Sequence, residues 1–171
     1  MSDIAFKEKV KKVFISQPFS DFTNEEIEDE RDRIKEVLGE LIYGKFEILP
    51  NYQPMPEGKN NLWCLGRSLQ YLSEADIIFF SDVYLDIMRL KSKGCMIENL
   101  CNMLYNENII AIYECGLEQY LKYTNIFENF IAENHLYLND DYRFNTNISL
   151  VNKKGGYKYV IVRRINSEKI I

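Results

Sequence analysis

Compact apolar runs alternate along this chain with longer stretches in which apolar residues recur every three or four positions. The compact runs predict β-strands at residues 12–16, 46–49, 75–80 and 108–113. The periodic stretches predict α-helices at residues 25–41, 62–72, 97–105 and 116–132. Strands that alternate with helices form a parallel sheet with right-handed crossovers and helices on both faces. The pattern therefore predicts an α/β fold with a doubly wound, Rossmann-like or flavodoxin-like sheet.

Turn and capping residues separate these elements. Pro18 and Pro50 end the first two strands, because proline has no amide hydrogen to donate within a sheet. Thr23 and Glu26 have the spacing of a capping box at the start of the first helix, whose many charged residues predict a solvated face. The segment 51–61 is rich in proline, asparagine and glycine, which predicts a mobile loop or lid.

The last third of the chain departs from this alternation. After the predicted helix at residues 116–132, two strand-like runs at residues 147–151 and 157–162 flank a turn with two glycines, which predicts a β-hairpin. Such a hairpin extends the sheet antiparallel or pairs with another subunit, and the sequence leaves both open. We interpret residues 1–115 as one α/β domain and residues 116–171 as a C-terminal helix and hairpin extension of the same domain.

Composition narrows the classes of partner. The 171 residues, 46% of them hydrophobic, are enough for one domain with a sizeable core. The formal net charge of -5 argues against binding to a nucleic acid polymer or to an anionic membrane surface. No apolar run approaches the ~20 residues that span a bilayer, and the first residues lack the apolar core of a signal peptide. We therefore expect a cytoplasmic protein without a membrane partner.

Thiols and imidazoles are too few for several common kinds of site. The four cysteines, Cys64, Cys95, Cys101 and Cys115, form no Cys-x-x-Cys pair and are interpreted as reduced core residues. His135 is the only histidine, which leaves little from which to build a zinc site or a Ser-His-Asp triad. No metal or other cofactor is expected.

One acidic residue falls where doubly wound sheets bind their ligands. In such sheets the crevice lies outside the carboxyl ends of the strands, and the loops after the first three predicted strands reach that edge together with segment 92–98. Ser92 and Gly94 suit a turn before a helix, which places Glu98 in the first helical turn. Glu98 is then either an acid that the helix dipole favours or a functional carboxylate in the crevice.

Four segments, in this order, carry a resemblance to a known family. VFISQPF, the helical segment that ends LGRSLQYLSEAD, the strand IIFF and the turn GCMIEN together resemble the nucleoside 2-deoxyribosyltransferase superfamily, including its small phage and bacterial branch. The similarity covers residues 12–113 and leaves out the tail. The pattern Ser-x-Gly-x-x-x-Glu at Ser92, Gly94 and Glu98 is similar to that of the members that hydrolyse 2-deoxynucleoside 5-monophosphates.

The resemblance implies roles for the matching residues. Glu98 matches the glutamate that attacks the anomeric carbon of a nucleoside and forms a glycosyl ester, a reaction that needs no metal. Ser92, Gly94 and the neighbouring amides match the site of a 5′-phosphate, a role that the N-terminus of a helix also suits. The family commonly assembles into oligomers, so the resemblance implies a homo-oligomer.

The first-strand loop of the family surrounds the sugar. Ser16, Gln17 and Pro18 match that loop and are candidate substrate-binding residues. Phe14 falls where many members have a tyrosine, and it is either part of the substrate site or a core residue of the strand.

The chain departs from the family at the group that assists the leaving base. An aspartate lies at this position in the better-known branches, whereas Ser68 lies there in this chain, and a serine cannot act as a carboxylic acid. Asp82, just past the third predicted strand, is the nearest substitute on the crevice side, or it caps a turn. Tyr84 and Trp63 are candidates for stacking on a base.

We therefore expect cleavage or transfer at the N-glycosidic bond of a nucleoside or nucleotide, with Glu98 as nucleophile. The alternative, motivated by Ser68, is a catalytically inactive protein that binds a nucleotide or an ADP-ribose-like ligand. A third possibility is a protein-interaction role centred on the tail, because a fold does not fix its function.

Overall fold

The computed structural model describes residues 4–5, 9–19, 22–81, 92–105, 109–134 and 146–164. Its main sheet has six strands, which lie in the order β4 (Phe46–Ile48), β2 (Lys11–Ser16), β5 (Ile77–Phe80), β6 (Ile110–Tyr113), β8 (Lys158–Arg164) and β7 (Thr146–Asn152). The first four strands are parallel to one another, and β8 runs antiparallel to both β6 and β7. The predicted Rossmann-like α/β fold is confirmed.

The central strands are buried on both faces, as their continuous apolar runs predict. Val13, Phe14 and Ile15 of β2 have no exposed surface, and the same is true of all four residues of β5. The register pairs Ser16 with Phe80 at the ends of these two strands. Both strands therefore end at the same level, and the residues that follow them meet at the carboxyl edge of the sheet.

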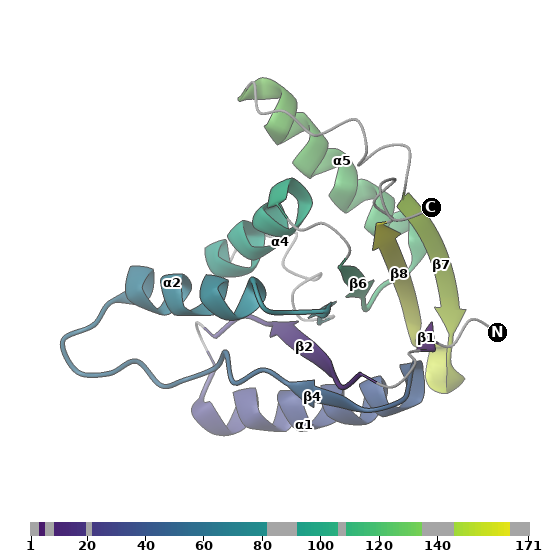
Figure 1. Cartoon of the computed structure of the whole chain (residues 1–171). Helices are drawn as coiled ribbons and strands as arrows, with labels where there is room; N and C mark the ends of the chain where they lie inside the picture. The colour runs from purple at the N-terminus through teal and green to yellow at the C-terminus, as the bar shows by residue number, and fades with distance from the viewer. Residues whose placement is uncertain are drawn as a thin grey trace.

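Helices cover both faces of the sheet (Figure 1). On one face, α1 (Asn24–Leu41) packs Ile34 and Leu38 against Val13 and Ile15 of β2. On the other face lie α2 (Asn61–Leu72), α4 (Lys93–Tyr105) and α5 (Leu117–Glu133), which share a second apolar cluster with Phe14. Because successive side chains of a strand point to opposite faces, β2 contributes to both clusters.

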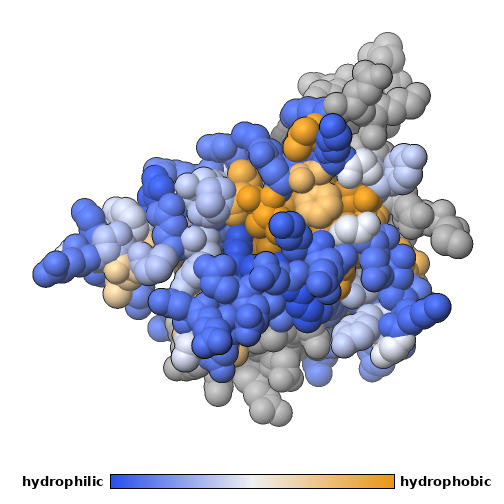
Figure 2. Space-filling view, turned by 90° about the horizontal axis from the view of Figure 1, so that it is seen from below, coloured by the Kyte–Doolittle hydropathy of each residue, from blue (hydrophilic) through white to orange (hydrophobic). Residues whose placement is uncertain are grey.

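The predicted capping box starts α1. The hydroxyl of Thr23 accepts the amide hydrogen of Glu26 at 3.2 Å, and the carboxylate of Glu26 accepts the amide hydrogen of Thr23 at 2.7 Å. Viewed from below, where α1 lies in Figure 1, the surface is mainly hydrophilic, with the largest gathering of hydrophobic residues near the middle of the view (Figure 2).

The predicted hairpin is confirmed, and it extends the sheet rather than standing apart from it. Its second strand, β8, pairs antiparallel with β6, for example through Ile112 and Ile161. Gly155 and Gly156 in the turn have φ angles of 84° and 82°. Only glycine adopts such angles at little cost, so these two residues allow the chain to reverse there.

A second, two-stranded sheet pairs β1 (Ile4–Ala5) in parallel with β3 (Ile42–Tyr43). The sequence pattern indicates only a polar lead-in before residue 12 and a loop after the first helix. Pairs of two residues are too short to produce an alternating pattern, so sequence periodicity does not detect them. Among the described residues, no helix has the length and apolar content needed to cross a membrane.

Candidate functional site

The carboxyl ends of β2 and β5 form the topological switch point of the sheet. From β2 the chain crosses to β4 on one side, and from β5 it crosses to β6 on the other. Ligands of open α/β sheets bind in the crevice outside such a point. Ser16 and Gln17 lie at the end of β2, and Ser81 follows β5 with its amide nitrogen 3.4 Å from the carbonyl oxygen of Ser16. The candidate site is built around these residues.

Glu98 of α4 reaches this point and is buried, with 5% of its surface exposed. The hydroxyl of Ser16 donates to Oε2 of Glu98 at 2.6 Å, and the hydroxyl of Ser68 in α2 donates to Oε1 at 2.6 Å. Both serines are buried as well. Residues from two other elements therefore fix the carboxylate, and each of its oxygens keeps a lone pair for a further contact.

Burial determines the pH range in which the Glu98 carboxylate ionises. Burial raises the pKa of Glu98 from 4.5 to about 7, because removal from water disfavours the charged form. The hydrogen bonds from Ser16 and Ser68 act in the opposite direction, since they favour the carboxylate. Glu98 therefore exchanges its proton near neutral pH, which suits a group that takes part in chemistry.

The helix that carries Glu98 begins earlier than the sequence pattern predicts. Ser92 caps α4: its hydroxyl accepts the amide hydrogen of Cys95 at 3.3 Å, and its carbonyl oxygen accepts that of Met96 at 3.2 Å. Gly94 therefore belongs to the helix instead of the turn before it. Glu98 lies in the second turn, so the prediction of a first-turn acid was wrong.

Ser68 is in direct contact with the carboxylate of Glu98. Its hydroxyl has Glu98 as acceptor and only 3% of the residue is exposed. At the position where the resemblance implies an acid for the leaving base, this chain thus has a hydrogen-bond donor to Glu98. The geometry gives Ser68 a positioning role.

A second polar group lies on the other face of the sheet. Ser16 and Gln17 are consecutive, so their side chains point to opposite faces, and Gln17 points toward α1. The side-chain oxygen of Gln17 accepts a hydrogen bond from Arg31 at 3.2 Å, and its nitrogen donates to the carbonyl oxygen of Ile27 at 3.3 Å. Gln17 is therefore held at both ends of its amide.

Arg31 connects the loops that follow β2 and β4. Its guanidinium donates to the carbonyl oxygen of Leu49 at 3.0 Å and to Oδ1 of Asn51 at 3.1 Å, and Asn51 donates to the carbonyl oxygen of Ile15 at 2.9 Å. Burial lowers the pKa of Arg31, because removal from water disfavours the charged guanidinium, while the carboxylate of Glu28 acts in the opposite direction.

Arg31 was not predicted as a buried residue from the sequence, because the charges of the first helix predict a solvated face. A signal was present: Arg31 follows Ile27 by four positions and precedes Ile34 by three, so it falls on the apolar stripe of the helix. A charged residue on such a stripe needs buried partners, which the loops after β2 and β4 supply.

A third group of charges lies at the end of β6. Glu114 follows that strand, has 3% of its surface exposed and accepts hydrogen bonds from both terminal nitrogens of Arg33 at 3.0 and 2.5 Å. Arg33 also pairs with Glu30, one turn away on α1, at 2.7 and 2.9 Å. The hydrogen bonds that Arg33 donates to Glu30 and Glu114 raise its pKa. The pattern of charges along α1 does not distinguish this arginine from its solvated neighbours.

The other predicted site residues have different outcomes. Phe14 has no exposed surface and lies in the apolar core, as the core interpretation predicts. Pro18 is buried next to Gln17 and lines a small pocket. Asp82 and Tyr84 lie outside the described residues.

The structure also bears on Trp63 and on the cysteines, which were interpreted from the sequence. Trp63 has Lys59 and Arg67 near its ring, at 5.7 and 5.9 Å from the ring centroid, which is a cation–π arrangement. Cys95 and Cys115 are buried, in agreement with their interpretation as core residues, whereas Cys64 and Cys101 are only partly buried. Within the part of the chain that the structure describes, no group of three His, Cys, Asp or Glu side chains is placed to hold a metal ion.

Comparisons of the chain with models of protein families, with curated proteins and with solved structures find no match.

Proposed function

We propose that this protein cleaves or transfers the N-glycosidic bond of a nucleoside or nucleotide, with Glu98 as the nucleophile. The observation that carries the proposal is the buried carboxylate of Glu98, held at both oxygens by the hydroxyls of Ser16 and Ser68 at the switch point of the sheet. A carboxylate that is desolvated, fixed in orientation and ionised near neutral pH has the properties of a nucleophile in glycosyl transfer.

The proposed reaction has two steps. In the first, an oxygen of Glu98 bonds to the anomeric carbon of the sugar while the bond to the base breaks, and the base leaves with the electron pair and takes up a proton. In the second step, water or another base attacks the glycosyl ester and restores the carboxylate. Water gives a hydrolase, and a second base gives a transferase.

The two serines have defined parts in this proposal. Each donates one hydrogen bond to Glu98, which keeps the plane of the carboxylate constant and leaves a lone pair on each oxygen free to attack. Positioning of this kind lowers the entropy cost of reaching the transition state. The Ser92 hydroxyl caps α4. A role of Ser92 and Gly94 in holding a 5′-phosphate stays a prediction.

The test is a chromatographic assay for free base. Pure protein is incubated with deoxynucleosides, ribonucleosides and their 5′-monophosphates, each with and without a second base as acceptor. We expect base release from at least one substrate and its loss, by at least about 1000-fold, in Glu98→Gln, because the amide is not a nucleophile.

Glu114→Gln is the matched control. Glu114 is also a buried glutamate near the carboxyl edge, but it contacts Arg33 on the α1 face rather than the two serines. We expect this variant to keep base release even if it is less stable. Base release by Glu98→Gln at the unaltered rate would remove Glu98 from the mechanism. Absence of release from every substrate by folded wild-type protein would favour the inactive ligand-binding alternative.

A further inference from the structure

The two edges of the main sheet differ in how they are protected against pairing with another chain. At one edge, β4 has only three residues, carries the charge of Glu47 and ends shortly before Pro50. Short length, charge and proline all keep an edge strand from pairing. At the other edge lies β7, which has seven residues, none of them charged and none a proline (Figure 1). Among the strands that the structure describes, only β8 pairs with it.

The regular pairing of β7 with β8 fixes the direction of its backbone groups. Every residue of β7 has a partner on β8, so no β-bulge twists this edge away. Where the same ladder continues into the turn, the amide of Lys153 donates to the carbonyl oxygen of Tyr157 at 2.9 Å. Hydrogen-bonded residues alternate along an antiparallel ladder. The backbone groups of Ser149 therefore point toward β8, and those of Ile148 and Leu150 point outward.

The two residues with outward backbone groups also carry exposed apolar side chains. Ile148 and Leu150 have 46% and 53% of their surface exposed. Their partners on β8, Val162 and Val160, are buried in the apolar cluster to which α5 contributes. Partners in a ladder lie on the same face of the sheet. Ile148 and Leu150 therefore continue a layer of the core to a position where the described helices leave it exposed.

We propose that β7 pairs antiparallel with β7 of a second copy of this chain, with the two-fold axis at Ser149. This register overlaps the whole strand and joins the outward backbone groups of Ile148 to those of Leu150 of the partner subunit. A two-fold interface is self-complementary, so the same pair recurs on the other side of the axis. The apolar side chains of both copies then form one cluster, and two six-stranded sheets become continuous.

Charge and size determine how strong this contact is. Each chain has a formal net charge of -5, but β7 itself has no charge, so no like charges face each other across the pair. A stable interface has about 20–30 residues on each side, and the seven residues of β7 are fewer. We therefore expect a reversible dimer that forms in the micromolar range. Sedimentation of the full chain from about 1 to 300 μM should show the change from monomer to dimer.

A disulfide tests the register. At the axis, Ser149 faces Ser149 of the partner subunit in a pair without hydrogen bonds, and the Cα atoms of such a pair lie ~4.5 Å apart, within reach of a disulfide. Ser149→Cys should therefore form disulfide-linked dimers under mild oxidation. Asn147→Cys is the matched control, because this register places it opposite Val151 of the partner subunit. It should link no more than the wild type, whose own cysteines lie outside β7.

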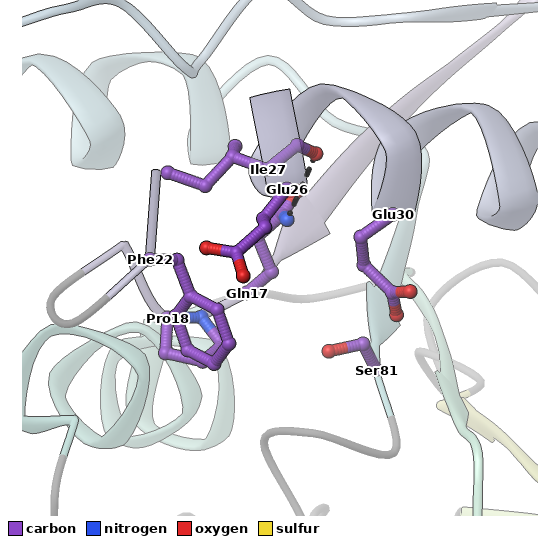
Figure 3. A pocket seen from close by; sticks show the side chains of 7 residues that line it. All are labelled: Gln17, Pro18, Phe22, Glu26, Ile27, Glu30 and Ser81. Carbon is purple, nitrogen blue, oxygen red and sulfur yellow. Dashed lines mark hydrogen bonds between the residues drawn. The ribbon is translucent and has the colours of Figure 1, made fainter. Parts of the chain in front are cut away.

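Charge substitutions test the apolar pair. Leu150→Lys should abolish the dimer over the same range of concentration, because it places a charge in the apolar cluster. Addition of Ile148→Glu should strengthen association about tenfold relative to Leu150→Lys alone, since the register sets each new carboxylate opposite a new ammonium group. Phe22→Lys is the control. Phe22 is also exposed and apolar, but it lines the pocket beside α1 (Figure 3), so this variant should dimerise like the wild type.

The proposed interface is independent of the proposed function, because none of its residues contributes to the contacts of Glu98. Protein that stays monomeric to about 300 μM, or that assembles into species larger than a dimer, would overturn it. So would equal disulfide formation by Ser149→Cys and Asn147→Cys, or a Leu150→Lys variant that dimerises like the wild type.

Discussion

Ser16 and Gln17 are neighbours in sequence, yet they organise two polar groups on opposite faces of the sheet. Ser16 donates to Glu98 on the α4 side, and Gln17 is bound by Arg31 on the α1 side. The alternation of a β-strand produces this division, and the end of β2 at the switch point places both groups beside one crevice. A substitution on one face therefore need not disturb the other, which makes the two groups separable by mutation.

Removal of either serine hydroxyl should move the titration of Glu98 to higher pH. Hydrogen bonds from Ser16 and Ser68 favour the ionised carboxylate, so Ser16→Ala or Ser68→Ala raises the pKa of Glu98 above its value of about 7. Since the nucleophile must be ionised, the rate of base release at pH 6.5 should fall about tenfold and recover partly at pH 8.5. The measurement is the pH profile of kcat/KM.

The control for these serines is Ser73→Ala, at the end of α2, whose hydroxyl bonds only to the carbonyl oxygen of Gln70 among the contacts that the structure describes. Its pH profile should match that of the wild type. An unchanged profile in both Ser16→Ala and Ser68→Ala would contradict the positioning role of the two hydroxyls.

Glu98→Gln should make the protein more stable at alkaline pH. The pKa of Glu98 is raised by burial from 4.5 to about 7, so the folded state holds the proton more tightly than the unfolded state between these values. The stability is therefore fully present below pH 4.5 and is lost as the pH rises to about 7, by about 3 kcal/mol in the free energy of unfolding. Glutamine carries no charge and avoids this loss.

Urea unfolding of wild type and Glu98→Gln at pH 4.5, 6, 7 and 8 measures the effect. The two free energies of unfolding should be similar at the lowest pH and separate as the pH rises, with the variant the more stable. Glu47→Gln, at an exposed carboxylate on β4, should follow the wild type at every pH. Parallel curves for wild type and Glu98→Gln would show that burial of Glu98 has no such cost.

The sequence predicts the arrangement of strands and helices around this site better than the contacts of the residues within it. Alternating strands and helices determine the order of elements, and the crevice rule then brings the end of β2 and the residue Glu98 to one edge. The turn of the helix on which Glu98 lies was mispredicted, because the Ser92 cap extends α4 backwards through Gly94. Apolar periodicity gives little information about where a helix begins when small and polar residues precede it.

The partners of buried polar groups were harder to predict. Ser68 was considered only as the substitute for an aspartate, and its bond to Glu98 depends on how α2 packs beside α4, which no local pattern encodes. Arg31 lies on an apolar stripe, but its acceptors come from the loops after β2 and β4, far from it in sequence. Pairings between distant segments follow from tertiary packing and not from the residues nearby.

Arg31 should be a major contributor to stability. Its removal leaves the side-chain oxygens of Gln17 and Asn51 and the carbonyl oxygen of Leu49 without this donor in a buried region. We expect Arg31→Met to lower the free energy of unfolding by about 2–4 kcal/mol, because each unpaired buried group costs about 1–3 kcal/mol and the costs are not additive.

Arg31→Lys should not restore the loss, since an ammonium group does not present the planar fork that reaches several acceptors at once. The exposed neighbour Asp32 supplies the control, and Asp32→Ala should stay within about 0.5 kcal/mol of the wild type. Chemical unfolding with equal m-values gives these differences. A loss below 1 kcal/mol for Arg31→Met would mean that the loops rearrange to pair with water.

Two glycine-to-alanine substitutions should have opposite effects on stability. Gly156 has a φ angle of 82° and no atom within 4 Å of the position of an added Cβ, so Gly156→Ala is disfavoured by the backbone angle alone. We expect a loss of about 1–2 kcal/mol in the free energy of unfolding, the usual cost of a positive φ angle for an L-residue.

Gly39 lies inside α1 and also has open space around it, so Gly39→Ala should gain about 0.5–1 kcal/mol through helix propensity. Thermal unfolding of the two variants beside the wild type measures both effects: a gain in Gly156→Ala would contradict the cost of the positive φ angle, and a loss in Gly39→Ala would contradict the gain from helix propensity.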